Sequence, residues 1–140
     1  MRLGDDEEYV GISASREAYE KGATDPDIFA AAEVRVGDFS AAIGTVVAQS
    51  DWSAFLTALL ELDQKRRGEA LLRSADGAEL RLRIYASDGA GHMAVAGEIE
   101  RRDLPSHPRF AFEGVQFDPT RLPELVAELK AVAGGGGETA

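Results

Sequence analysis

Residues 49–85 of the chain read QSDWSAFLTALLELDQKRRGEALLRSADGAELRLRIY, and inside this stretch the spacing of apolar residues changes from that of a helix to that of a strand. Up to Gly68 the apolar residues recur at i, i+3, i+4, i+7 and i+8, which places them in one stripe of an amphipathic helix. Ser50 or Asp51 can cap its N-terminus, and Gly68 can supply the left-handed residue that ends it. The stripe consists of Trp52, Phe55, Leu56, Leu59 and Leu60. We expect this helix to pack on a sheet.

Two β-hairpins are predicted directly after this helix. A loop of Ala75–Gly77 would place Leu72 opposite Leu80, so that core residues face core residues. The next reversal, ASDGAGH, would place His92 opposite Tyr85 on the outer face of the sheet. The alternation then predicts that the following side chains point inward: Leu80, Leu82, Ile84, Met93, Val95, Gly97 and Ile99.

The regions on either side add strands and a second helix. Residues 8–14, 29–36 and 39–48 are predicted strands, and Gly37-Asp38 is a hairpin signal between the last two. In residues 109–117 apolar and polar residues alternate again. The apolar positions change from even to odd numbers between Phe112 and Val115, which predicts a bulge at Gly114. Asp118 and Pro119 predict a short 3₁₀ turn. The helix that follows has its apolar stripe at Leu122, Leu125, Val126, Leu129 and Val132.

These elements predict an α+β fold, with an antiparallel, largely meandering β-sheet and two amphipathic helices packed on it. A chain of 140 residues is long enough to bury its own core without a metal or a disulfide. We expect a single α+β domain over residues 1–133. Residues 134–140, GGGGETA, are expected to form a flexible Gly-rich tail.

The composition restricts the classes of function. The chain has no cysteine, which excludes disulfides, thiolate metal sites and a cysteine nucleophile. Its formal net charge of −10 disfavours binding to nucleic acid or to anionic membranes and favours a basic partner. The acidic start MRLGDDEEYV does not resemble a signal peptide, and no apolar run approaches the roughly 18 residues of a membrane helix. We therefore expect a cytoplasmic protein.

No sequence motif predicts a catalytic centre or a cofactor. The chain lacks a phosphate-binding loop of the P-loop type, an HExxH motif and a GxSxG motif. His92 and His107 are its two histidines, and nothing in the sequence places either beside a nucleophile and an orienting acid. The outward-facing residues of the two hairpins after the helix carry charges of both signs, so they form either a solvated sheet face or a recognition surface. This outward row consists of Arg81, Arg83, Tyr85, His92, Glu98 and Glu100.

Two acidic segments are the candidate partner-binding residues. The first segment could in principle ligate Mg²⁺ or Ca²⁺, but adjacent acids that lead into a strand point to opposite faces. A solvated acidic edge or a partner-facing patch fits the spacing better than a metal site. Asp25 and Asp27 flank Pro26, as in a turn. The candidate contacts are Asp5, Asp6, Glu7, Glu8, Asp25 and Asp27.

The order of elements resembles that of the WapI family of bacterial immunity proteins. The resemblance runs over residues 51–132, through DWSAFLTALLEL, GEALLRS, ELRLRI, GAGHMAVAGEI and RFAFEGVQFDPTRLPELVAELKAV, and more faintly through FSAAIGTVVA. Its most specific parts are Gly91-His92 with Val95 and Gly97, and Asp118 with Leu122-Pro123. The resemblance implies a non-enzymatic cytosolic antitoxin that neutralises the C-terminal domain of a polymorphic toxin, one such toxin being a nuclease that acts on tRNA. It assigns no contact residue.

Two other functions remain open at the level of the sequence. A small-molecule-binding module would need a roomy apolar pocket between helix and sheet. A metal-dependent enzyme would need cations bound at Asp5 or Glu7.

Overall fold

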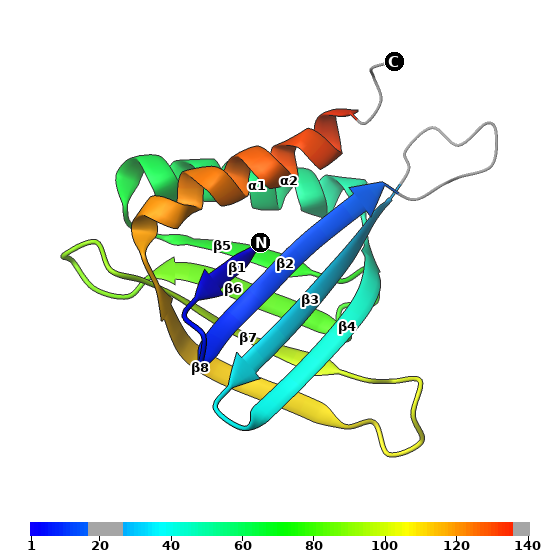
Figure 1. Cartoon of the computed structure of the whole chain (residues 1–140). Helices are drawn as coiled ribbons and strands as arrows, with labels where there is room; N and C mark the ends of the chain where they lie inside the picture. The colour runs from blue at the N-terminus through cyan, green and yellow to red at the C-terminus, as the bar shows by residue number, and fades with distance from the viewer. Residues whose placement is uncertain (17–26, 136–140) are drawn as a thin grey trace.

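The computed structural model describes residues 1–16 and 27–135, and their strands form two antiparallel four-stranded sheets (Figure 1). The first sheet has the order β1 (Arg2–Gly4), β2 (Glu8–Arg16), β3 (Ile28–Val36) and β4 (Phe39–Val47). The second has the order β5 (Glu69–Arg73), β6 (Leu80–Ala86), β7 (Met93–Glu100) and β8 (Arg109–Phe117). The α+β class, the antiparallel pairing and the meandering order are therefore confirmed, with the strands divided between two sheets.

The two sheets and two helices enclose one hydrophobic core. Alternate residues of β3 are buried, namely Ile28, Ala30, Ala32 and Val34, so one face of the first sheet points inward. Helices α1 (Gln49–Lys65) and α2 (Leu122–Gly135) lie side by side across one end of the two sheets in Figure 1. The outward faces of both sheets thus stay uncovered by the helices.

Helix α1 is rotated slightly from the predicted phase. Trp52, Phe55 and Leu59 are buried as predicted, but Leu60 is 43% exposed and Leu62 is buried in its place. The predicted stripe was therefore wrong at its C-terminal end, because the helix packs against both β5 and α2 and its buried face is set by the two together.

Both predicted ends of α1 were also wrong. The N-cap residue is Ala48, which makes no side-chain capping bond, so Ser50 and Asp51 already lie inside the helix. The helix ends at Lys65, and the C-cap residue is Arg66, whose φ of 57° is left-handed and whose N–H donates to the carbonyl of Leu62. Gly68 lies beyond this end.

The predicted register of both hairpins in the second sheet was wrong by two residues, although the inward faces are correct. Leu72 lies opposite Leu82 instead of Leu80, because the connection is wrapped around the carboxylate of Asp76. Tyr85 lies opposite Ala94 instead of His92, because Asp88 accepts hydrogen bonds inside that loop and lengthens it. A shift of two residues preserves the face of every side chain.

The bulge and the 3₁₀ turn near the C-terminus are confirmed. Val95 pairs with Val115 and Gly97 pairs with Phe112, so β8 carries an extra residue at Gly114, whose φ is 77°. The 3₁₀ turn spans Pro119–Arg121, and the side chain of Asp118 accepts from the N–H of Thr120. Helix α2 continues to Gly135, and residues 136–140 of the predicted tail lie outside the described residues.

Candidate partner-binding surface

The first candidate segment forms the turn between β1 and β2. Asp5 Oδ1 accepts from the N–H of Glu7 at 2.8 Å and from that of Glu8 at 2.9 Å, and Asp5 N donates to the carbonyl of Glu8 at 2.8 Å. The N–H groups of Glu8 and Glu7 hold the pKa of the Asp5 carboxyl below its ordinary value of 3.8. The turn therefore keeps this carboxylate charged, and it presents Asp6, Glu7 and Glu8 to solvent.

A second turn brings one more carboxylate to the same place. The N–H of Gly37 donates to the carbonyl of Glu7 at 2.9 Å, which holds the β3–β4 turn against the β1–β2 turn. Asp38 in that turn is exposed. Both turns lie at the same end of the first sheet in Figure 1, at the opposite end of β2 from the helices. We call this group the acidic tip: Asp5, Asp6, Glu7, Glu8 and Asp38.

The charges of the acidic tip are not neutralised within the described part of the chain. None of its carboxylates has a lysine or arginine at ion-pair distance among residues 1–16 and 27–135. The neighbouring Arg35 instead donates its Nε–H to the carbonyl of Gly37 at 3.1 Å. The tip is thus available to cations of another molecule.

The structure does not bring Asp27 of the second candidate segment to the acidic tip. Asp25 lies outside the described residues, and Asp27 directly precedes β3. Glu8 pairs with Val36, whereas Arg16 pairs with Ile28, so Asp27 lies beyond the opposite end of β2. At about 3.3 Å per residue, Asp27 and the acidic tip are separated by roughly 25 Å.

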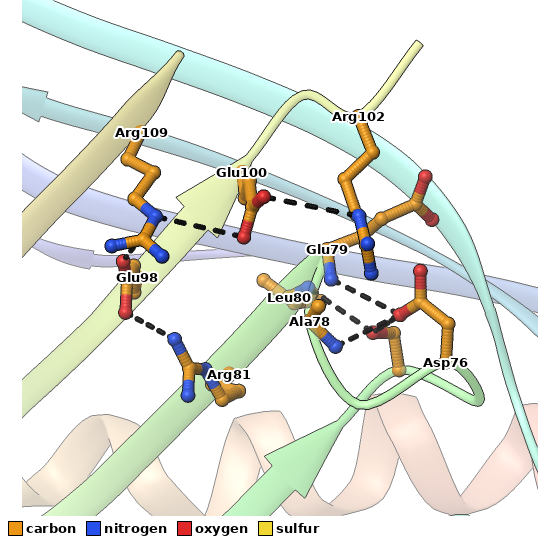
Figure 2. A network of polar contacts seen from close by, with 10 residues as sticks. Asp76, Ala78, Glu79, Leu80, Arg81, Glu98, Glu100, Arg102 and Arg109 are labelled. Atoms are coloured by element: carbon orange, nitrogen blue, oxygen red, sulfur yellow. Dashed lines mark hydrogen bonds and ion pairs between the residues drawn. The ribbon is translucent and has the colours of Figure 1, made fainter. Parts of the chain in front are cut away.

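The charged residues of the outward row predicted on the second sheet are paired, either with each other or with neighbouring charges outside the row. Figure 2 shows Arg81 paired with Glu98, while Arg109 Nε lies 3.6 Å from Glu98 and 3.7 Å from Glu100. Arg102 Nε completes the chain at 3.8 Å from Glu100. Because each carboxylate here has a guanidinium beside it, this face carries little uncompensated charge.

The remaining members of that row do not extend the network. Arg83 pairs with Glu69 at 2.6 Å and lies over the ring of Tyr85 at 4.1 Å. His92 is not on the sheet face at all, since it lies in the β6–β7 loop with its Nδ1 2.6 Å from Asp88 Oδ2. The Asp88 pKa is lowered, chiefly by this contact.

The outward face of the first sheet forms a groove that was not predicted from the sequence. The groove measures about 790 Å³, and the Arg2–Glu33 and Arg101–Asp103 pairs are among its lining residues. Its floor contains small residues of three adjacent strands, Gly11, Ser13, Ala31, Ala42 and Gly44. The sequence signal was the recurrence of Gly, Ser and Ala at alternate positions of β2, β3 and β4.

The described residues contain no group of three or more histidine, aspartate or glutamate side chains placed to hold a metal ion. In the same part of the chain, neither helix is long and apolar enough to cross a membrane.

Comparison with known proteins identifies a family to which the chain is similar. The model of the immunity protein WapI-like family matches residues 1–134. No curated protein matches the chain, and no solved structure does. The family match extends beyond the resemblance over residues 51–132 and includes the whole first sheet with its acidic tip.

Proposed function

The chain belongs to the immunity protein WapI-like family, and we propose that it is a non-enzymatic, cytoplasmic antitoxin that neutralises a polymorphic toxin by binding its C-terminal domain. We propose further that this domain is basic and acts as a nuclease. A nuclease needs a cationic groove for its substrate, and an acidic protein can occupy such a groove.

The observation that carries the proposal is the group of unneutralised carboxylates at one end of the first sheet. They come from two turns joined by the Gly37–Glu7 hydrogen bond, so the backbone that carries them is positioned before any partner arrives. A preformed acidic surface loses little conformational entropy on binding. By contrast, the paired charges of the second sheet would have to be separated to serve a partner. Asp25 and Asp27 are proposed as a second, separate contact.

Binding of a small molecule between helix and sheet is not favoured by the packing. The inward stripe of α1 is filled by Trp52, Phe55, Leu59 and Leu62, and that of α2 by Leu122, Leu125 and Leu129, all of them buried. The groove described above is open and lies on the outward face of a sheet.

Co-expression tests the proposal. The candidate toxin domain encoded beside this chain is expressed alone, together with the wild-type chain, and together with a chain in which Asp6, Glu7, Glu8 and Asp38 are replaced by Asn or Gln. We expect the domain to stop growth and degrade RNA when alone, the wild-type chain to restore growth, and the substituted chain to protect poorly. If the domain is harmless alone, or stays lethal beside the wild-type chain, the immunity function is wrong.

A further inference from the structure

The two sheets have four edge strands, and β4 differs from the other three. β1 is three residues long, β5 packs beside α1 and carries Glu69 and Arg73, and β8 is bulged at Gly114 and carries charged residues. Short length, charge, bulges and covering elements are the usual means by which proteins prevent strand addition at a sheet edge. β4 spans nine residues with the sequence FSAAIGTVV, which contains no charge and no proline.

The strand register shows which backbone groups of β4 point away from the sheet. The Gly37-Asp38 turn makes Val36 and Phe39 a hydrogen-bonded pair, so Phe39, Ala41 and Ile43 bond to β3. The N–H and C=O groups of the alternate residues, Ser40, Ala42, Gly44 and Val46, then point outward. The hydrogen bond from Ala75 N to the carbonyl of Val46, at 2.7 Å, agrees with this assignment.

Three of these outward residues have no backbone partner on that side in the part of the chain that the structure describes. Ser40, Ala42 and Gly44 are exposed, and within the described ranges no hydrogen bond joins their outward N–H and C=O groups to another segment. Of the eight strands in the described residues, none runs along this part of β4 in Figure 1. Unpaired edge groups of this kind form the template for an added strand.

Phe39 gives a second, independent observation at the same edge. Its side chain is 71% exposed, the most of any large apolar side chain among the described residues. It begins β4, next to Asp38 of the acidic tip. A strand added to β4 would cover Phe39 and would place one of its ends beside the unneutralised carboxylates.

We propose that the free edge of β4 binds an extended segment of the cognate toxin as a fifth strand of the first sheet, with lysine or arginine at the end that lies beside the acidic tip. This inference rests on the proposed function and adds the mode of contact. Main-chain hydrogen bonds to Ser40, Ala42 and Gly44 supply affinity. Burial of the Phe39 side chain under the added strand, and attraction between its basic residues and the acidic tip, supply specificity.

A single segment fits this edge better than a second copy of the chain. Arg101 and Asp103 in the β7–β8 connection line the same groove as Ala42 and Gly44, so the space beside β4 is bounded. A second copy would also bring together two bodies of net charge −10.

Amide hydrogen exchange followed by NMR tests this mode of contact on the full-length protein, free and mixed with the toxin domain used in the co-expression experiment. We expect the N–H groups of Ser40, Ala42 and Gly44 to exchange fast in the free protein and at least tenfold more slowly in the complex. Those of Ala41 and Ile43 should be protected in both samples. Slow exchange that appears as the free protein is concentrated would identify a second copy as the occupant and overturn the proposal.

Two substitutions add an independent readout. Ala42→Pro removes an N–H that bonds to no other segment within the described ranges and places a ring in the path of an added strand, so it should weaken toxin binding at least tenfold while leaving the unfolding transition close to that of the wild type. Phe39→Ser should weaken binding as well. Leu60→Ser is the matched control, because it removes an exposed leucine from α1 at the helical end of the molecule.

The outcomes separate the two proposals. If the wild-type chain neither binds nor neutralises the domain, the proposed function fails. The wild-type chain could instead neutralise the domain while the N–H groups of Ser40, Ala42 and Gly44 still exchange fast in the complex and Ala42→Pro binds the domain normally. In that case the immunity function stands and the added strand is wrong.

Discussion

Gly97 of β7 has no room for a side chain beside β6. A Cβ atom at this position would lie 2.4 Å from the carbonyl oxygen of Arg81 and 2.8 Å from a methyl carbon of Leu82. Because backbone must move to make room, we expect Gly97→Ala to lower the free energy of unfolding by about 1–3 kcal/mol. Gly89→Ala is the control, since a Cβ atom at Gly89 would meet nothing within 4 Å. Urea denaturation of both variants measures the difference, and equal midpoints would contradict the expected clash.

The Asp76 carboxylate holds the β5–β6 loop and predicts part of the pH dependence of stability. It accepts from Ala78 N, Ser74 Oγ and Glu79 N, and the first two chiefly lower the pKa of Asp76 from its ordinary value of 3.8. Because the folded-state pKa lies below that of the unfolded chain, this charge stabilises the fold at neutral pH. The stabilisation is lost as the pH falls from about 4 through the folded-state pKa.

Asp76→Asn tests this dependence, because the amide keeps a hydrogen-bond acceptor and removes the charge. We expect the variant to be less stable than the wild type at pH 7 and to lose less stability on acidification from pH 5 to pH 2. Chemical denaturation at a series of pH values gives the free energy of unfolding of each protein as a function of pH. Parallel curves for the two proteins would show that Asp76 does not contribute to the acid transition.

At the scale of the element, α1 shows which part of a helix the sequence defines. The spacing of Trp52, Phe55 and Leu59 fixes the buried stripe over most of its length. The spacing does not show which of Leu60 and Leu62 is buried near the end of the helix, because both lie within one turn of the stripe. Which of the two is buried depends on where β5 and α2 pack against the helix. A local apolar pattern therefore gives the presence and face of the helix, but not its final phase.

This difference between neighbouring leucines of α1 can be measured. Leu59 is fully buried, so Leu59→Ala should lower the free energy of unfolding by about 2–5 kcal/mol through lost burial and a residual cavity. Leu60→Ala removes a 43% exposed side chain and should change the stability by less than about 1 kcal/mol. Thermal unfolding of the two variants, identical in composition, provides the comparison. Similar losses would place Leu60 in the core, as the sequence pattern alone suggests.

In the strands, the local sequence predicts which residues face inward, but it does not predict the register between neighbouring strands. Alternation predicts the inward residues of β6 and β7, since each face repeats every second residue. The register depends on the carboxylates of Asp76 and Asp88, which take up loop N–H groups and lengthen each connection. Because these errors amount to two residues, the apolar pattern could not reveal them.

At the scale of the whole molecule, the candidate surface combines residues that are distant in the chain. The DDEE segment is visible in the sequence, but Asp38 joins it only because Glu8 pairs with Val36. The same pairing separates Asp27 from the tip. The free edge of β4 is likewise a property of the assembled sheets, since it depends on no strand of residues 1–16 or 27–135 lying beside Ser40–Gly44.

The position of the negative charge, and not only its total, should govern association with a basic toxin domain. If the acidic tip guides a basic toxin domain, replacing Asp6, Glu7, Glu8 and Asp38 by Asn or Gln should slow association at least tenfold at low salt. The same substitutions should flatten the dependence of the association rate on ionic strength, because exposed charges are screened over about 10 Å at 0.1 M salt. Asp5 is retained, since its carboxylate holds the turn.

A control variant with the same net charge separates position from total charge. It carries Asn or Gln at Asp51, Glu61, Glu113 and Glu124, which lie on the helices and the second sheet. Stopped-flow association of the wild type and both variants with the toxin domain, over a range of salt concentrations, gives the rates and their slopes. If the two variants slow association equally, the net charge of −10 alone accounts for the attraction, and the acidic tip has no special role. A larger loss in the tip variant would mean that the field guiding the partner originates at one end of the first sheet, next to the edge proposed to receive its strand.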